Sequence, residues 1–427
     1  MRRCALMLTA AALAALLPLP ALAQLPQRAA ASTARPEQAG LSSERLQSAM
    51  AALDAEVKAG NIPGALLLVA RKGKVVFFEG TGQLDPEAKS PMIRDGIFRL
   101  YSMTKPITSV AAMMLVEEGR LSLADPVAKY IPEFAAVKVG VETPGADGKP
   151  VLSLAAPRRP MTVHDLMRHT SGLTYGFFGS GLVKQAYVES GLGGRNLNNE
   201  EFSKALAGLP LMHQPGSNWE YSQSTDVLGR VVEVASGQTL FAFMKQRILD
   251  PLGMRDTSFT VADPAKFPRI AEPFKADRNF GVNANFSEPR NPARYESGGG
   301  GMVGTAIDYA RFLQMLLNGG SFEGKRYLSP ATLRFMTEDH VAGIGTGSAY
   351  LPGEGYGFGL GFQVRRADGQ SPLHGTAGDY SWGGAGGTAF WVDPKQQMFV
   401  VFMMQSPKHR VTLRNRLRGL VYGAIIK

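Results

Sequence analysis

Cysteine is almost missing from this sequence of 427 residues. The only cysteine is Cys4, so no disulfide can form within the chain and no cysteine-based zinc or iron–sulfur site is available. No apolar run reaches the roughly 18–20 residues that a membrane span needs. No segment recurs with a period of about 20–50 residues, which excludes a solenoid or a propeller. These absences leave a globular protein with neither crosslinks nor repeats.

Clustered charge is missing as well. The chain has 46 Lys and Arg against 36 Asp and Glu, a net charge of +10, and the basic residues are scattered along it. Nucleic-acid binding usually shows a basic stripe together with a recognisable motif, and neither occurs here. With 44% hydrophobic and 19% charged residues, the chain can bury a large core. We therefore expect a folded protein without a nucleic-acid partner.

The N-terminal segment has the pattern of an export signal. Arg2 and Arg3 precede an apolar run at 5–17, and Ala21-Leu22-Ala23 forms a small-residue cleavage site before Gln24. The pattern predicts a signal peptide over 1–23, followed by a loose lead-in over 24–40. We expect an exported protein, periplasmic or extracellular, with no stable membrane insertion after cleavage.

Strand patterns lie near both ends of the chain, and helical patterns lie between them. Apolar periodicity predicts a helix over 41–58, and two apolar runs around Lys72-Gly73 predict a hairpin of strands 65–70 and 75–79. Further strands are expected at 359–365, 388–392 and 398–404, before a basic amphipathic helix over 410–425. The order predicts an α/β fold in which one antiparallel sheet, built from both termini and flanked by helices, carries an inserted all-α subdomain. The predicted domains are an α/β sandwich of 41–100 with 336–427 and a mainly helical domain of 101–335.

Ser102 and Lys105 form the first candidate for chemistry. They lie three residues apart where a helical pattern begins, so both side chains share one face and the amine can reach the hydroxyl. A helix N-terminus also provides positive potential and a free amide where an oxyanion would form. Ser102 is the only serine in the chain with a lysine at +3. The spacing alone is equally compatible with a serine that caps a helix beside a surface lysine.

Two further segments could contribute to the same site. Tyr221 follows a Pro-Gly turn and precedes a helical pattern, and as a base it would need a nearby cation such as Lys105. Trp382-Gly383-Gly384-Ala385 opens a strand pattern, where glycines permit a close approach by substrate and the Ala385 amide could point at a carbonyl oxygen. Taken singly, the tyrosine is typical of a packing residue, and the glycines are typical of a bulged strand edge.

Taken in order, these segments are similar to three motifs of a known family. Ser102-x-x-Lys105, Tyr221-Ser222-Gln223 and Trp382-Gly383-Gly384 resemble the motifs of serine β-lactamases and penicillin-binding proteins. The likeness is closer to the class C β-lactamase-like esterases called family VIII carboxylesterases. It extends over roughly 41–425 and includes the segments 161–173, 250–259, 298–320 and 383–405. His374-Gly375-Thr376 could mimic the third motif, but the strand and turn after Trp382 have the expected spacing.

The resemblance implies a β-lactamase/transpeptidase-like fold and an acyl-enzyme mechanism without a cofactor. Ser102 would be the nucleophile, with Tyr221 or Lys105 as the base and the backbone amides of Ser102 and Ala385 as the oxyanion hole. The substrate would contact Gln223, Trp382, Gly383 and Gly384. The loops at 175–197 and 267–297 would wall the entrance.

Two departures from the lactamase motifs favour a small carboxylic ester as the substrate. Gln223 stands where β-lactamases have Asn, and Trp382 stands where they have Lys. The alternatives on the same fold are a β-lactamase, a D-alanyl-D-alanine carboxypeptidase or another amide hydrolase, and, from another class, a binding protein without catalysis. No Gly-x-Ser-x-Gly or His-Glu-x-x-His pattern occurs, so neither an α/β-hydrolase nor a metalloprotease is expected. His164 and His169 do not share a helical face, and we expect no metal site.

Overall fold

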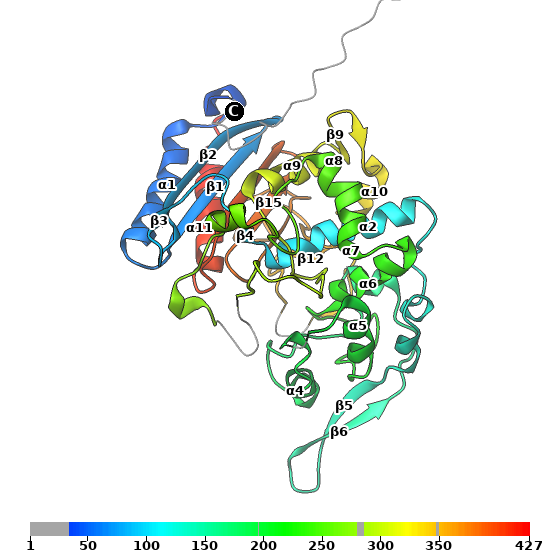
Figure 1. Ribbon diagram of the computed structural model, residues 1–427. Coiled ribbons are helices and arrows are strands. Elements are labelled where there is room, and N and C mark those ends of the chain that lie inside the picture. The colour runs from blue at the N-terminus through cyan, green and yellow to red at the C-terminus, as the bar shows by residue number, and fades with distance from the viewer. Residues whose placement is uncertain (1–33, 195, 280–285, 347–349) are drawn as a thin grey trace, which may run out of the picture.

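The computed structural model describes residues 34–194, 196–279, 286–346 and 350–427. The predicted signal peptide lies outside the described residues, as does most of the lead-in. Within the described ranges, the two ends of the chain meet in one sheet, with the largest helical region on one side of it (Figure 1).

In the described part of the chain, the sheet has eight strands, and every neighbouring pair is antiparallel. Its order is β12-β13-β14-β15-β16-β1-β2-β3, so the N-terminal strands join the C-terminal ones where β1 pairs with β16. This confirms the predicted sheet from both termini. The strands are β1 (Gly64–Arg71), β2 (Lys74–Asp85), β3 (Ser90–Pro91), β12 (Tyr356–Phe358), β13 (Gln363–Arg365), β14 (Tyr380–Gly383), β15 (Ala389–Asp393) and β16 (Met398–Met404).

The central strands have the continuous apolar sequences of strands buried on both faces. Every residue of β1 and β16 is buried, as a sheet covered by helices on both sides requires. The predicted hairpin of β1 and β2 is confirmed, and Lys72 and Gly73 turn it with positive φ angles of 52° and 73°.

One strand prediction near the C-terminus is wrong. The segment 359–365 is not a single strand, because the chain turns between β12 and β13. Gly361 has a φ of 98°, and a side chain on Gly359 would lie 2.3 Å from the Met336 carbonyl oxygen. Two glycines that permit this turn therefore split the apolar run into a hairpin. The Trp382 motif, in turn, ends strand β14 instead of opening the next one.

Two helices cover one face of the sheet (Figure 1). These are α1 (Ser43–Lys58) and α11 (Arg410–Gly423), close to the predicted ranges. Ser42 caps α1 by accepting a hydrogen bond from the Arg45 amide. The apolar sides of both helices and the outward side of β1 and β16 form one buried cluster.

The larger core lies on the opposite face of the sheet. Helix α2 (Thr104–Glu117) lies at its centre and is buried over almost its whole length, because its sequence is apolar on all sides. The other helices are α3 (Val163–Met167), α4 (Leu182–Glu189), α5 (Asn199–Ala207), α6 (Ser224–Ser236), α7 (Leu240–Met244), α8 (Asp250–Leu252), α9 (Ala306–Leu317) and α10 (Pro330–Met336). A π-helical segment, Lys245–Leu249, joins α7 to α8.

The region between residues 101 and 335 also contains strands that the helical pattern does not predict. A hairpin of β5 (Val139–Pro144) and β6 (Pro150–Ala155) extends away from the body (Figure 1). Most of its residues are exposed, so no apolar periodicity marks it. Six further two-residue strands of the described ranges form three short ladders: β4 (Phe98–Arg99) with β8 (Val303–Gly304), β7 (Asn218–Trp219) with β11 (Gly345–Thr346), and β9 (Ser321–Phe322) with β10 (Lys325–Arg326). Of these, β4 and β11 lie just outside the region 101–335.

Within the described ranges, no single helix has the length and hydropathy of a membrane span. Two successive helices, over 224–236 and 240–252, meet those limits only together, and they are bent by 75° at the break between them.

Candidate active site

Ser102 lies in a single helical turn that leads directly into α2. This turn, Tyr101–Met103, brings the hydroxyl to the N-terminal end of the buried helix. The spacing of three residues then places Lys105 Nζ 3.3 Å from Ser102 Oγ. Tyr101 has a φ of 47°, in the left-handed region that residues with a side chain seldom adopt. The strained residue therefore directly precedes the candidate nucleophile.

Tyr221 reaches Ser102 from another part of the helical region. It lies between β7 and α6, and its hydroxyl oxygen is 2.7 Å from Ser102 Oγ. The indole Nε1 of Trp382 donates a hydrogen bond of 3.2 Å to the same phenolic oxygen. Residues separated by more than 100 positions thus meet at one hydroxyl group.

The Lys105 side chain is completely buried and has three oxygen neighbours. Besides Ser102 Oγ, its Nζ donates to the Gly299 carbonyl oxygen at 2.6 Å and to the Tyr175 hydroxyl at 3.2 Å. The amine also lies 4.6 Å from the centre of the Tyr221 ring. Among the described residues, no carboxylate forms an ion pair with Lys105. All three N–H groups of an ammonium would be used on neutral oxygens.

Aromatic rings surround Tyr221 and exclude water from its ring. The nearest ring centres are those of His169 at 4.9 Å, Tyr175 at 5.3 Å and Trp382 at 5.4 Å. Burial, together with the positive charge of Lys105, holds the pKa of His169 well below its ordinary value. Burial also raises the pKa of Tyr175 well above its ordinary value, with the charge of Asp226 adding to the effect. Both groups are therefore neutral near pH 7.

The turn after β14 packs against Leu100 and against Tyr101, the first residue of the serine turn. A side chain on Gly384 would lie 2.4 Å from the Leu100 carbonyl oxygen, and one on Gly386 would lie 2.8 Å from the Tyr101 ring. Thr388 Oγ1 donates to the same Leu100 carbonyl at 3.1 Å. Between these glycines, the Ala385 N–H has no hydrogen-bond acceptor among the described residues, and the same holds for the Ser102 N–H. Two free amides on adjoining segments are what an oxyanion hole requires.

Gln223 begins α6, two residues after Tyr221. Its side-chain oxygen is buried without a hydrogen-bond partner among the described residues. A buried amide that lacks a partner gains stability from a polar ligand, because leaving it unpaired costs free energy. The position of Gln223 is therefore compatible with the predicted contact to substrate.

The predicted entrance segments occupy different places. Tyr175 begins the first of them, and its hydroxyl contacts Lys105 instead of only lining an opening. In the second segment, 267–297, the Ala271 and Ser287 carbonyl oxygens accept hydrogen bonds from the buried Arg99 guanidinium, which holds this part of the segment against β4. Residues 280–285 of the segment lie outside the described residues.

The histidines named in the sequence lie outside the cluster around Ser102, apart from His169. His164 Nε2 is 3.0 Å from His340 Nδ1, and burial is the main reason that its pKa falls to about 4. His374 lies beside Tyr422 of α11, and its carbonyl accepts from Arg365 and Arg418. In the described part of the chain, no three His, Cys, Asp or Glu side chains are arranged to hold a metal ion.

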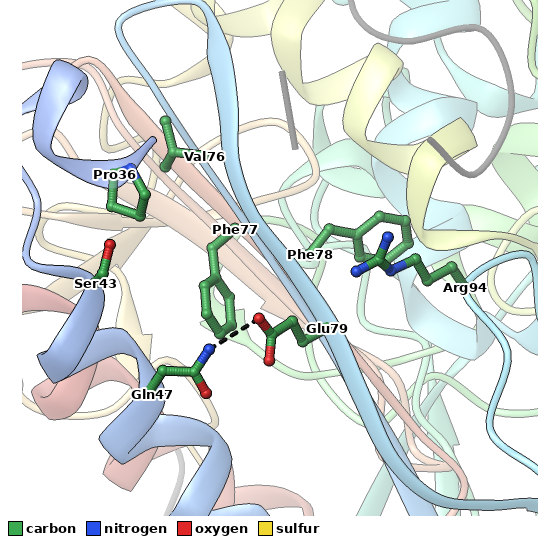
Figure 2. Close-up of a pocket in the computed structure, with 8 residues that line it drawn as sticks. All are labelled: Pro36, Ser43, Gln47, Val76, Phe77, Phe78, Glu79 and Arg94. Carbon is green, nitrogen blue, oxygen red and sulfur yellow. Dashed lines mark hydrogen bonds between the residues drawn. The ribbon is translucent and has the colours of Figure 1, made fainter. Parts of the chain in front are cut away.

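A separate hollow of about 180 Å³ lies between α1 and β2, where it contains none of the motif residues (Figure 2). Figure 2 shows Gln47 of α1 bonded to Glu79 of β2 across it, at 2.9 Å. Arg94 lies over the ring of Phe78, at 5.7 Å from its centre. Side chains of the sheet and α1 thus already contact one another across this hollow.

Three contacts of the cluster were not predicted from the sequence: Tyr175 and Gly299 as partners of Lys105, and the Trp382 indole as a donor to Tyr221. Only the Gly-rich segment 298–320 carried a signal, through its likeness to the family. No spacing rule links a tyrosine or a backbone carbonyl to a lysine that far away in the sequence.

Comparison with known proteins identifies the class. The model of the family described as Beta-lactamase matches residues 47–422, so the chain belongs to the β-lactamase family. It is 37% identical over 355 residues to an uncharacterized protein of Mycobacterium tuberculosis, covering 81% of this chain and 86% of the relative. It is also 34% identical over 394 residues to Esterase EstB of Burkholderia gladioli, covering 87% and 94%.

A solved structure supports the same class. EstCE1, a hydrolase with promiscuous acyltransferase activity, superimposes with a TM-score of 0.75 at 29% identity and covers 89% of this chain and 99% of its own. The predicted resemblance to family VIII-like esterases and the predicted fold are thereby confirmed. The protein is a serine hydrolase of the carboxylesterase-like kind.

Proposed function

We propose that this protein hydrolyses carboxylic esters of small molecules through an acyl-enzyme on Ser102. The observation that carries the proposal is the meeting of three groups: Ser102 Oγ lies 2.7 Å from the Tyr221 hydroxyl and 3.3 Å from Lys105 Nζ. A nucleophile in contact with both a base and a cation is the arrangement that acyl transfer needs. The esterase named among the relatives supports an ester as the substrate.

In the proposed reaction, Ser102 Oγ attacks the ester carbonyl carbon while its proton passes to Tyr221. Two contacts support Tyr221 as the base: the Trp382 N–H donates to its oxygen, and Lys105 lies against its ring. Both contacts place a full or partial positive charge against the Tyr221 side chain. The Ser102 and Ala385 amides would bind the oxyanion, and one such donor is typically worth ~3–4 kcal/mol in the transition state.

Collapse of the tetrahedral intermediate breaks the bond to the alkoxy group, which takes the proton from Tyr221 and leaves as the alcohol. Water then attacks the acyl-Ser102 carbonyl and gives its proton to Tyr221. The second collapse releases the carboxylic acid and returns the proton to Ser102. The overall reaction consumes only an ester and water and releases an alcohol and a carboxylic acid, so no cofactor is required.

Trp382 supports esters over β-lactams as substrates. In β-lactamases, which this chain resembles, a lysine stands at this position and helps to hold the β-lactam carboxylate. Here the indole has no charge, and its only polar group is already bonded to Tyr221. A free carboxylate on the substrate would therefore gain little from this residue.

The test replaces the nucleophile and a matched serine on the same helix. Ser102→Ala should lower kcat for p-nitrophenyl butyrate at least about a thousandfold and abolish covalent labelling by a fluorophosphonate. Ser109→Ala is the control, because Ser109 is buried in α2 and its hydroxyl has no partner among the described residues. Labelling of the Ser102→Ala protein would refute the nucleophile. Faster turnover of nitrocefin than of the ester would refute the substrate class.

We further propose that the protein is exported, on the evidence of the pattern at 1–23. Mass spectrometry of protein from the periplasm or the medium should find a chain that begins at Gln24. A mature chain that still begins at Met1 would contradict export by this signal.

A further inference from the structure

A glycine-rich loop connects the candidate catalytic amine to a buried carboxylate. This loop, residues 297–301, runs between α2 and α6. Lys105 Nζ donates to the Gly299 carbonyl oxygen at 2.6 Å, and the N–H of the same residue donates to Asp226 Oδ1 at 3.1 Å. Ser297 Oγ also donates to Asp226 Oδ1, at 2.5 Å. The amine and the carboxylate are thus separated by a single residue's backbone.

Close packing leaves this loop little freedom to move. A side chain on Gly299 would lie 2.4 Å from Asp226 Oδ2, and one on Gly298 would lie 2.7 Å from the Thr225 carbonyl oxygen. On the side of α2, Thr108 Oγ1 donates to the Gly298 carbonyl at 2.8 Å. Because only glycine fits here, the backbone approaches both helices closely and places the Gly299 carbonyl at Lys105.

Asp226 has no direct positive partner. Its side chain is 5% exposed, and no Lys, Arg or His among the described residues forms an ion pair with it. A buried charge without a partner is costly, so a carboxylate and an ammonium at this separation stabilise each other. Lys105 lacks a direct negative partner in the same way. The two charges therefore complement one another across the Gly299 backbone.

The other titratable groups around Lys105 are either neutral or already paired with another charge. Tyr175 and Tyr221 face it from the loops before α4 and α6, and His169 faces it from the segment after α3. Burial first, and then the charge of Asp226, raises the pKa of Tyr175 and of Tyr295. Glu220, next to Tyr221, is paired with Lys184 at 2.9 Å.

We propose that Asp226 is a positioning residue for the reaction. Through the Gly299 backbone it fixes the Lys105 amine beside Ser102 and places a negative charge behind it, which leaves Tyr221 to take the serine proton. This role rests on the proposed function, because it concerns the same acyl-enzyme chemistry. The same role explains the Gly-rich segment 298–320, whose only signal in the sequence is its likeness to the family. Gly299 in this segment connects Asp226 to Lys105.

The test removes the charge and keeps the shape. Asp226→Asn should lower kcat for p-nitrophenyl butyrate about tenfold near pH 7 and leave KM within about twofold. The alkaline limb of the kcat/KM profile should move to lower pH by about one unit, because the ammonium loses its opposite charge. Asp226→Glu, which keeps the charge, should restore the position of that limb.

Asp308→Asn is the matched control. Asp308 is a buried aspartate in the first turn of α9, and it too accepts from one backbone N–H and one hydroxyl, those of Asp256 and Thr257. Its variant should change the melting temperature but not the alkaline limb. If Asp226→Asn likewise lowers only the melting temperature, Asp226 has a structural role alone and the proposal is wrong.

Ser297→Ala keeps the proposal testable if Asp226→Asn does not fold. It removes one donor to the carboxylate but keeps the charge and the Gly299 hydrogen bond, so the alkaline limb should stay in place. A limb that moves to lower pH with the charge intact would overturn the assignment.

Failure of the proposed function gives a different result. If the wild-type protein labels with fluorophosphonate but hydrolyses no ester, the substrate class is wrong. The alkaline limb of the labelling rate then still tests Asp226, by comparison of wild type with Asp226→Asn. If the wild type does not label at all, the assignment of Ser102 as the nucleophile is wrong, and the proposed role of Asp226 is then wrong as well.

Discussion

Two sets of buried cations in this molecule, the pair Arg365 and Arg418 and the single Lys105, have different kinds of partners. On the α11 side of the sheet, Arg365 and Arg418 both bind the carboxylate of Asp379 directly, each at 2.6 Å. In the cluster around Ser102, the equally buried Lys105 touches only neutral oxygens. The carboxylate nearest to it in this network, Asp226, binds the far side of the Gly299 backbone.

The difference shows what each charge is available to do. A carboxylate in direct contact with two guanidinium groups offsets one of their two charges and locks their geometry. A cation whose counter-charge lies one residue's backbone away keeps much of its field for the nearby hydroxyl and phenol. The Asp379 group therefore stabilises the fold, whereas Lys105 can act on the reaction.

Removing the Lys105 charge should have the strongest effect on activity. Lys105→Met should lower kcat for p-nitrophenyl butyrate about a thousandfold or more, because the cation beside the nucleophile is lost. The melting temperature should fall only slightly, because Asp226 loses its indirect counter-charge but keeps its hydrogen bonds from Gly299 and Ser297. Steady-state kinetics and thermal unfolding of one preparation measure both. A large loss of stability would mean that Lys105 is structural in the way that Arg365 is.

The complementary substitution, Asp379→Asn, removes the carboxylate that pairs with Arg365 and Arg418. It leaves two buried guanidinium groups without a counter-charge, so the free energy of unfolding should fall by about 3 kcal/mol. Urea unfolding measures this loss, and kcat per folded molecule should stay near the wild-type value. If kcat instead falls as it does for Lys105→Met, the two groups of cations are not functionally separate.

Removing the Trp382 N–H, the neutral donor to Tyr221, should have a weaker effect on activity. Trp382→Phe removes the N–H that reaches Tyr221 and keeps most of the ring packing. Losing one donor to a phenolate should lower kcat/KM about tenfold and move its acid limb to higher pH. The alkaline limb should stay in place, because the surroundings of Lys105 are unchanged. Equal movement of both limbs would indicate general disorder of the site.

Local patterns predicted much of the fold. The runs that became β1, β2, β15 and β16 are apolar and bounded by turn residues, and the C-terminal helix is amphipathic. The β5–β6 hairpin was missed because its exposed residues carry no apolar period. The apolar segment at 359–365 predicts one strand, since nothing local shows that Gly359 lies against the Met336 carbonyl.

For the site, one pair follows from local spacing, Ser102 with Lys105, because two residues three positions apart on a helix share a face whatever surrounds them. The resemblance in motifs added Tyr221 and Trp382 as members of the site. That the indole donates to the phenol, and that a carboxylate lies behind Gly299, depends on the packing of the whole fold. Those contacts join helices and strands more than 70 residues apart, and their geometry depends on how whole elements pack, which no local spacing encodes.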